Sequence, residues 1–235
     1  MQAVIIAGGQ GTRLGALTKE IPKPLVPVVG RPFLDRQLEL LASQGIDQVV
    51  LCIGHFGGQI REFVGNGSHW GLEAAFSEDG PTLLGTGGCL KKAEPLLAER
   101  FFMIWGDSYL LLDYGQVWRN FLDSGLAGLM VVWRNQGQKE PSNVRLSGNK
   151  VASYDKWSPS PEFDCIDYGL SAFDHSVLER IPRGQPYAIE QVFVDLATEG
   201  RLAAHVVEHP YFEIGSPAGL AELEQYILQQ EGQRP

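Results

Sequence analysis

Cysteine is scarce in this sequence. The 235 residues include three cysteines, Cys52, Cys89 and Cys165, which lie far apart and form no Cys-x-x-Cys pair. Disulfide frameworks and zinc sites both need paired or clustered cysteines. The pattern therefore argues against both kinds of stabilisation and fits a reducing compartment, the cytoplasm.

The sequence has fewer basic than acidic residues. Lysine and arginine number 19 against 28 acidic residues, which gives a formal net charge of −9 and a sequence pI of about 5.0. No basic run offsets this balance, so the phosphates of a polymer would be repelled. We therefore do not expect a nucleic acid polymer as a partner.

Long hydrophobic runs are also missing. No segment approaches the ~20 apolar residues of a membrane helix, and residues 1–7 are too short and lack the basic start of a signal peptide. No linker or low-complexity tract divides the chain. We expect a soluble protein with no membrane partner and a single domain over residues 1–235; self-association into a homo-oligomer stays open.

The most informative stretch runs from Ala3 to Pro27. Residues 3–7 are an unbroken apolar run, typical of a strand buried on both faces of a parallel sheet, and three glycines follow within residues 8–11. Such a turn exposes backbone amides at the carboxyl end of a strand, where they form an anion-binding concavity. Thr12 adds a hydroxyl and Arg13 a fixed charge with a planar donor fork. The segment predicts a phosphate cradle.

Glycine-rich turns also occur in folds that bind nothing, so the glycines alone decide little. Two named phosphate motifs fail on spacing. A Walker loop needs Gly-Lys-Ser/Thr where this chain has Gly11-Thr12-Arg13, and a dinucleotide fingerprint needs a small residue where Leu14 stands.

Apolar runs and helical spacings alternate along the chain, which predicts an α/β fold built on βαβ units. The aromatic residues Trp118, Phe121 and Trp133 are expected in the core. Predicted strands cover residues 48–53, 73–76, 101–105, 128–133, 166–173 and 201–207, a hairpin covers 143–154, and helices cover 33–42, 60–64, 89–98, 117–124, 187–197 and 220–230.

Asp107 follows the apolar run 101–105 after a single glycine, Gly106. Open α/β sheets bind ligands at the carboxyl ends of their strands, although a turn-capping aspartate is the ordinary alternative. We single out Asp107 as a candidate ligand for a cation.

The motifs together resemble the signature of the sugar-phosphate nucleotidylyltransferases, which join a nucleoside triphosphate to a sugar 1-phosphate. The resemblance covers nearly the whole chain. The matching segments, in family order, are residues 8–14, 22–27, 84–88, 106–107, 155–156, 166–169 and 213–217.

This resemblance implies a single-domain, Rossmann-like three-layer sandwich with a mostly parallel mixed sheet. It implies a nucleotide-binding part at about 1–110, a sugar-phosphate-binding part at about 111–220 and a C-terminal helix at about 218–230. The nucleotide-binding residues it implies are Ala7, Gly8, Gly9, Gly11, Thr12, Arg13, Gly85, Thr86 and Gly87.

The remaining roles also come from the resemblance. Arg13 is expected on the leaving pyrophosphate, Lys23 on the α-phosphate region, and Asp107 and Glu213 on Mg²⁺; the family has aspartate where Glu213 stands. Base recognition by Glu78 or Asp79 stays open. The residues expected to hold the sugar phosphate are Lys156, Asp167, Tyr168, Gly169 and Glu190, with Asp167 or Tyr168 near the place of a family asparagine.

The implied chemistry is attack of a sugar phosphate oxygen on the α-phosphorus, with pyrophosphate as the leaving group and no covalent enzyme intermediate. Within the family, residues 30–34 and 211–213 look most like heptose 1-phosphate guanylyltransferases. Uridylyl or cytidylyl transfer to another sugar or an alcohol phosphate is the alternative. A non-catalytic nucleotide-sensing module is the rival of another class.

Overall fold

The structure is a computed structural model that describes residues 1–9, 11–158 and 160–232. In these residues the chain forms one nine-stranded sheet with the strand order β5-β4-β1-β6-β11-β8-β12-β10-β9. The strands are β1 (Gln2–Ile6), β4 (Gln48–Ile53), β5 (Glu73–Glu78), β6 (Arg100–Trp105), β8 (Gly128–Arg134), β9 (Val144–Ser147), β10 (Lys150–Tyr154), β11 (Cys165–Asp174) and β12 (Leu202–Val207).

Six α-helices accompany this sheet in the described residues, together with two short strand pairs. The pairs are β2 (Pro27–Val28) with β3 (Arg31–Pro32), and β7 (Ser108–Tyr109) with β13 (Phe212–Glu213). The helices are α1 (Phe33–Ser43), α2 (Gly57–Val64), α3 (Gly85–Ala93), α4 (Tyr114–Ser124), α5 (Ile189–Thr198) and α6 (Pro217–Gly232).

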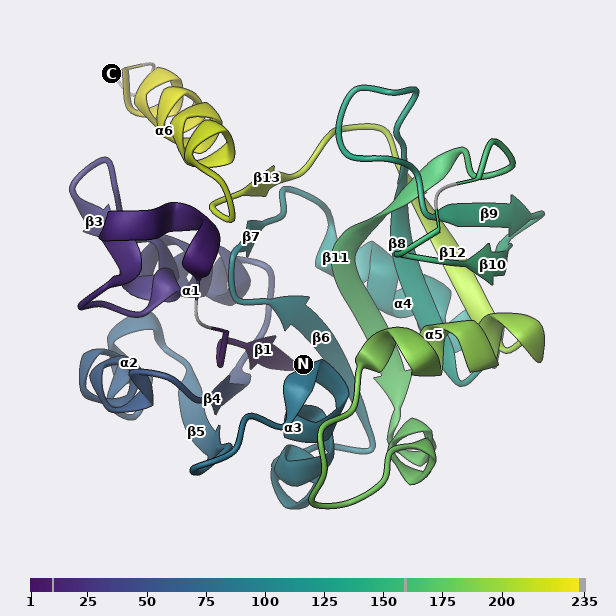
Figure 1. The fold of residues 1–235 in the computed structure, drawn as a ribbon, viewed down its shortest axis with the longest axis horizontal. Helices are drawn as coiled ribbons and strands as arrows, with labels where there is room; N and C mark the ends of the chain where they lie inside the picture. Colours follow the sequence, from purple (N-terminus) through teal and green to yellow (C-terminus); the bar gives the residue numbers. More distant parts are fainter. Residues whose placement is uncertain (10, 159, 233–235) are drawn as a thin grey trace.

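The sheet is mixed, as predicted. β5, β4, β1 and β6 are parallel neighbours, and β11 lies antiparallel between β6 and β8. In Figure 1 the purple-to-teal N-terminal half and the green later half lie side by side, and α6 returns to the N-terminal side. The late strand β12 is parallel to β8, whereas β10 is antiparallel to β12 and to β9.

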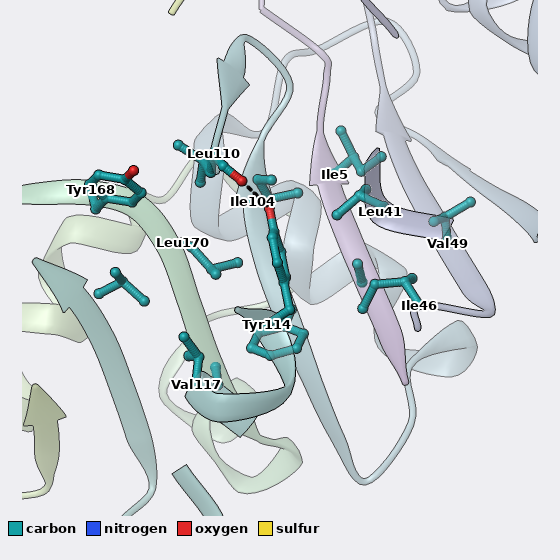
Figure 2. Close-up of a cluster of buried hydrophobic side chains, with 14 of the residues drawn as sticks. Ile5, Leu41, Ile46, Val49, Ile104, Leu110, Tyr114, Val117, Tyr168 and Leu170 are labelled. Atoms are coloured by element: carbon teal, nitrogen blue, oxygen red, sulfur yellow. Dashed lines mark hydrogen bonds between the residues drawn. The ribbon is translucent and has the colours of Figure 1, made fainter. Parts of the chain in front are cut away.

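Helices cover both faces of the sheet, which confirms the three layers. Alternate residues of the central strands enter opposite cores: Ala3 and Ile5 pack with α1, α2 and α4, whereas Val4 packs with α3 and α5. Figure 2 shows the first core, where the hydroxyl of Tyr114 donates to the Leu110 carbonyl at 3.4 Å. Burial on both faces explains why these strands are unbroken apolar runs.

The aromatic residues expected in the core are found there: Phe121 and Trp133 are buried, and Trp118 packs against the same cluster. None of the helices in the described residues is both long and apolar enough to cross a membrane.

Several helices begin a few residues away from their predicted starts, and the difference is largest at α3. The helix expected from residue 89 begins at Gly85, so the glycine-rich string is its first turn. The reason is a contact that is distant in sequence, because the amides of Gly87 and Gly88 donate to the Tyr187 carbonyl at 2.8 and 3.2 Å. Helix α5 correspondingly begins at Ile189 and not at Tyr187.

Candidate active site

The site lies where the direction of the fold reverses. From β1 the chain moves outward to β4 and β5, then returns to β6 on the other side of β1. Ligands of open α/β sheets bind at such a switch point, beyond the carboxyl ends of the strands. Ala7 follows β1 there, and Gly106 and Asp107 follow β6.

A first cavity of about 250 Å³ opens at this point. It brings together residues from the glycine loop, the start of α3 and the end of β6. The predicted site residues that line it are Ala7, Gly9, Gly11, Thr12, Arg13, Lys23, Thr86 and Asp107.

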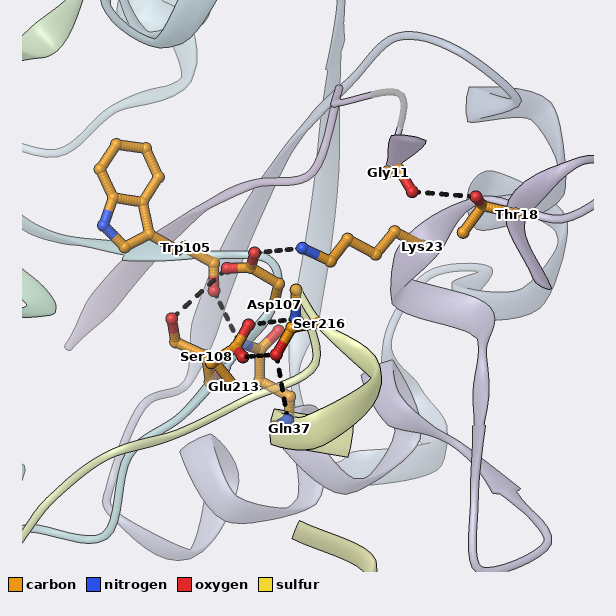
Figure 3. Close-up of polar contacts among 11 residues, drawn as sticks. Gly11, Thr18, Lys23, Gln37, Trp105, Asp107, Ser108, Glu213 and Ser216 are labelled. Carbon is orange, nitrogen blue, oxygen red and sulfur yellow. Dashed lines mark hydrogen bonds and ion pairs between the residues drawn. The ribbon is translucent and has the colours of Figure 1, made fainter. Parts of the chain in front are cut away.

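The glycine loop is shaped by its backbone. Gly11 has a positive φ of 64°, and a Cβ built on it would stand 3.1 Å from side-chain atoms of Lys23 and Thr18. The Thr18 hydroxyl donates to the Gly11 carbonyl at 3.0 Å (Figure 3). After this turn the chain enters a 3-10 segment, Thr12–Thr18, which carries Arg13 to the cavity.

Lys23 and Asp107 form an ion pair inside the cavity (Figure 3). Both side chains are largely buried, at 12% and 28% exposure. Gly106, which precedes Asp107, approaches β1 closely: its amide donates to the Ile6 carbonyl at 3.0 Å, and a Cβ there would lie 2.7 Å from that oxygen. Only glycine fits at this position without displacing β1.

Glu213 lies on β13, beside Asp107. The amide of Ile214 donates to the Asp107 carbonyl at 2.9 Å, so β13 and the turn after β6 are bonded together. The Glu213 carboxylate accepts hydrogen bonds from the Gly215 amide and, at 2.7 Å, from the Ser216 hydroxyl at the start of α6 (Figure 3). Besides lining the site, Glu213 therefore satisfies groups at a helix N-terminus.

The donors around Asp107 and Glu213 fit a hard divalent cation. Carboxylate oxygens are the ligands that Mg²⁺ prefers, and it usually takes one or two carboxylates and completes its shell with phosphate and water oxygens. Among the described residues no three His, Cys, Asp or Glu side chains cluster as metal ligands. Asp107 and Glu213 fit the pattern of one or two carboxylates.

A second cavity, of about 490 Å³, adjoins the first. Four residues, Arg13, Thr86, Trp105 and Asp107, line both. The second cavity also contains the predicted residues Lys156, Asp167, Tyr168, Gly169 and Glu213.

Glu190 lines neither cavity, but it contacts two residues that do, Thr86 and Lys156. Its carboxylate is 4% exposed, accepts from Lys156 Nζ at 2.6 Å and from the Thr86 hydroxyl at 3.2 Å. The Thr86 hydroxyl in turn accepts from the Ile189 amide at 2.9 Å. Glu190 therefore orients the lysine predicted to hold the sugar phosphate.

Asp167 lies at an irregularity of β11, where the register against β8 shifts between residues 167 and 171. Its carboxylate accepts from the Gly169 amide at 2.9 Å. Burial raises the pKa of Asp167 to about 6, although this hydrogen bond and the charge of Lys156 both act to lower it. The carboxyl group is thus poised to change charge near neutral pH.

Tyr187 leaves no room for a side chain at Gly85 or Gly87, whether or not these glycines contact a nucleotide. A Cβ at either position would stand 2.9 Å from an atom of Tyr187. The close backbone approach at this string is therefore to the chain itself, and contact of these two glycines with a nucleotide stays a prediction. So does contact by Gly8, where a Cβ would stand 3.4 Å from the Gly54 amide nitrogen.

The sequence reasoning missed several residues of the site. Trp105 lines both cavities, and Glu140, Asn143, Tyr154 and Tyr211 line the second. Trp105 could have been noticed because it directly precedes Gly106-Asp107. The others come from three separate segments, and only the fold brings them together.

Comparison with known proteins settles the family. A family model described as nucleotidyl transferase matches residues 2–229. The chain belongs to the nucleotidyl transferase family. This confirms the resemblance inferred from the motifs.

Family members of several specificities are similar to the chain. The D-glycero-alpha-D-manno-heptose 1-phosphate guanylyltransferase of Aneurinibacillus thermoaerophilus is 29% identical, over 97% of this chain and 100% of its own length. A mannose-1-phosphate guanylyltransferase of Mycobacterium tuberculosis is 29% identical over 92% of this chain. A UTP–glucose-1-phosphate uridylyltransferase of Synechocystis is 28% identical over 80%. The chain spans 62% and 52% of the lengths of these last two.

Among solved structures, HddC from Yersinia pseudotuberculosis superposes with a TM-score of 0.81 at 25% identity, over 96% of this chain and 99% of that one. The same protein complexed with GMP-PN gives a TM-score of 0.80 at 26% identity, with the same coverage. The fold of the family therefore extends over the whole sheet described above.

Proposed function

We propose that this protein transfers a nucleoside monophosphate from a nucleoside triphosphate to a sugar 1-phosphate and releases pyrophosphate. The observation that carries the proposal is the pair of adjoining cavities that share Arg13, Thr86, Trp105 and Asp107. A nucleotide in the first cavity presents its α-phosphate where a phosphate held in the second can reach it. Proximity and alignment of this kind supply much of the rate of such a reaction.

In this reaction an oxygen of the sugar phosphate forms a bond to the α-phosphorus, and the bond from that phosphorus to the bridging oxygen of pyrophosphate breaks. Lys156 holds the attacking phosphate, Lys23 neutralises the α-phosphate region and Arg13 the leaving pyrophosphate. Mg²⁺, held by Asp107 and Glu213, supplies further charge neutralisation when bound. Fixed charges aimed at the reacting phosphates stabilise the transition state without an enzyme nucleophile.

For the substrates we propose GTP and a heptose 1-phosphate. The support is the heptose 1-phosphate guanylyltransferase that matches this chain over its full length. Uridylyl or cytidylyl transfer is the alternative, supported by the UTP–glucose-1-phosphate enzyme. We propose the cytoplasm as its location, because three free, buried cysteines suit a reducing compartment.

The test is a pyrophosphate-release panel that combines four nucleoside triphosphates with heptose, mannose and glucose 1-phosphates and an alcohol phosphate, in the presence of Mg²⁺. Release should require both substrates and be fastest with GTP and the heptose phosphate. Preference for UTP or CTP would favour the alternative specificity. Nucleotide binding without turnover in any combination would favour a sensing module.

A matched pair of variants tests the site in the same assay. Arg13→Ala should lower the rate by ~10²–10³, the usual cost of removing a preorganised charge-stabilising group, without changing the midpoint of urea unfolding. Arg119→Ala, at a 67% exposed arginine on α4 outside both cavities, should leave the rate unchanged. Equal rates for both variants would remove Arg13 from the site.

A further inference from the structure

A buried glutamine on α1 reaches the turn that carries Asp107. Gln37 is 1% exposed, and its Nε2 donates to the carbonyl of Trp105 at 3.0 Å and to that of Ser108 at 2.8 Å (Figure 3). These two carbonyls bracket Gly106 and Asp107. Gln37 belongs to none of the motifs of this site.

The hydrogen bonds fix which way the Gln37 amide points. Both partners are carbonyl oxygens, so only the NH₂ group can serve them. The Gln37 Oε1 is then left buried with no hydrogen-bond partner in the described part of the chain. An unpaired buried acceptor costs free energy that an apolar side chain of the same size would avoid. Stability alone therefore gives a weak reason for glutamine here.

Other contacts with distant segments also hold the turn after β6: β7 pairs with β13, and the Asp107 carboxylate pairs with Lys23. The Gly106 amide bonds to Ile6 on β1, and the Asp107 carbonyl receives the Ile214 amide. Gln37 adds a support from the helix layer, to the two backbone carbonyls on either side of Gly106 and Asp107. Without it the carbonyls of Trp105 and Ser108 lose their buried donor, and the turn gains freedom to shift.

We propose that Gln37 is a positioning residue that fixes the Gly106–Asp107 turn, and so aims the Asp107 carboxylate at Lys23 and the shared wall of the two cavities. The inference deepens the proposed function and rests on it. Partners that orient a metal-binding group typically contribute a factor of 10–100 in metal affinity or activity.

The test compares Gln37→Met with Gln2→Met. Methionine keeps the length of the side chain and removes the donor. Gln2 is the matched control: it is 8% exposed, its Nε2 donates to the Leu96 carbonyl at 3.1 Å and its Oε1 accepts from the Ala98 amide at 2.7 Å, at the start of β1 and outside both cavities. Gln37→Glu is the second variant, isosteric but without the NH₂ group, in case Gln37→Met does not fold.

Three readouts are measured on the folded proteins. Hydrogen exchange of peptides over residues 104–109 should become faster in the Gln37 variants only. Binding of Mn²⁺ in the presence of GTP, followed by electron paramagnetic resonance, should weaken about tenfold or more. The Mg²⁺ concentration for half-maximal activity should rise by a similar factor, while Gln2→Met stays within about twofold of the wild type in all three.

Unchanged exchange at 104–109 together with unchanged Mn²⁺ binding in a folded Gln37 variant would overturn the inference and leave Gln37 as a packing residue. Equal changes in Gln2→Met would do the same, because they would trace to general loosening. If the wild type transfers no nucleotide in any combination, the proposed function fails, while hydrogen exchange and Mn²⁺ binding still judge Gln37 by themselves.

Discussion

Lys156 Nζ lies 2.6 Å from Glu190 Oε1, and the other oxygen of this buried carboxylate lies 3.2 Å from the Thr86 hydroxyl. The carboxylate thus holds the lysine against the wall between the two cavities. Because Glu190 is 4% exposed while the Lys156 side chain is 48% exposed, the ammonium faces the cavity and can still meet a phosphate. With a substrate bound, the Lys156 ammonium would contact both the Glu190 carboxylate and the substrate phosphate.

The first prediction concerns Lys156. Lys156→Met should raise the KM for the sugar 1-phosphate roughly tenfold or more and leave the KM for the nucleotide unchanged, since a hydrogen bond to a charged group contributes about 1.5–3 kcal/mol. Steady-state kinetics with each substrate varied in turn measures both constants. Lys150→Met is the control, because Lys150 donates to the Gly200 carbonyl outside both cavities. Equal increases in the two KM values would place Lys156 elsewhere in the mechanism.

The second prediction concerns Asp167 and pH. Its folded pKa of about 6 exceeds the ordinary 3.8, so between these values the folded protein binds a proton that the unfolded chain has released. The contribution of this group to the free energy of unfolding therefore falls as pH rises through that window. Asp167→Asn, which can still accept from the Gly169 amide, should unfold at a higher urea concentration than the wild type above about pH 7.

The pH series decides that prediction. The advantage of Asp167→Asn should shrink as the pH falls through this window, because only below 3.8 does the wild-type carboxyl become protonated in the unfolded as well as in the folded state. A difference in urea midpoint that stays constant from about pH 4 to pH 7.5 would contradict it.

The third prediction separates two roles of Glu213. Glu213→Gln should raise the Mg²⁺ concentration for half-maximal activity and lower the rate, because one carboxylate charge is lost, while Glu213→Asp should retain part of the function. Ser216→Ala removes the hydroxyl that donates to Glu213 and accepts from the Gly219 amide, so it should cost about 1 kcal/mol of stability; it should raise the Mg²⁺ requirement less than Glu213→Gln does, because the carboxylate charge remains. Wild-type Mg²⁺ dependence in Glu213→Gln would reduce Glu213 to its role at the start of α6.

The fourth prediction concerns Gly106. Gly106→Ala should lower the free energy of unfolding by about 1–3 kcal/mol, the usual range for overpacking, because its Cβ would lie 2.7 Å from the Ile6 carbonyl oxygen. Urea unfolding measures the loss. In Gly58→Ala on α2, where a Cβ meets no described atom within 4 Å, stability should instead rise by roughly 0.4–1 kcal/mol. Equal effects at both positions would show that the close approach to β1 carries no strain.

The sequence was sufficient to predict the central strands and to single out several residues that the structure brings together at their carboxyl ends. β1, β4 and β6 are buried on both faces, so each is an apolar run that stands out along the chain. The glycine loop follows β1, and Asp107 follows β6 after one glycine. Arg13 and Lys23 lie on 3-10 segments after the loop, and the resemblance, not the strand pattern, indicated that they would lie near Asp107.

Features that depend on distant contacts could not be predicted. The glycines at 85–88 have low helix propensity, and only the Tyr187 carbonyl explains why they form a first helical turn. Gln37 is one polar residue on a helix, and its two partners lie 68 and 71 residues away. The engagement of Glu213 with α6 likewise appears only once the chain has folded back.

The sheet order has a consequence for dividing this chain. β11, which comes after residue 164, lies antiparallel against β6 and pairs with it from Arg100 to Ile104. A fragment ending near residue 110 would keep the glycine loop and Asp107 but leave β6 as an open edge with Phe101, Phe102 and Met103 uncovered. Unpaired apolar edges recruit other strands and aggregate. The half that carries the glycine loop is therefore not a module that could be cut out and fused elsewhere; its last strand is completed by the half that follows.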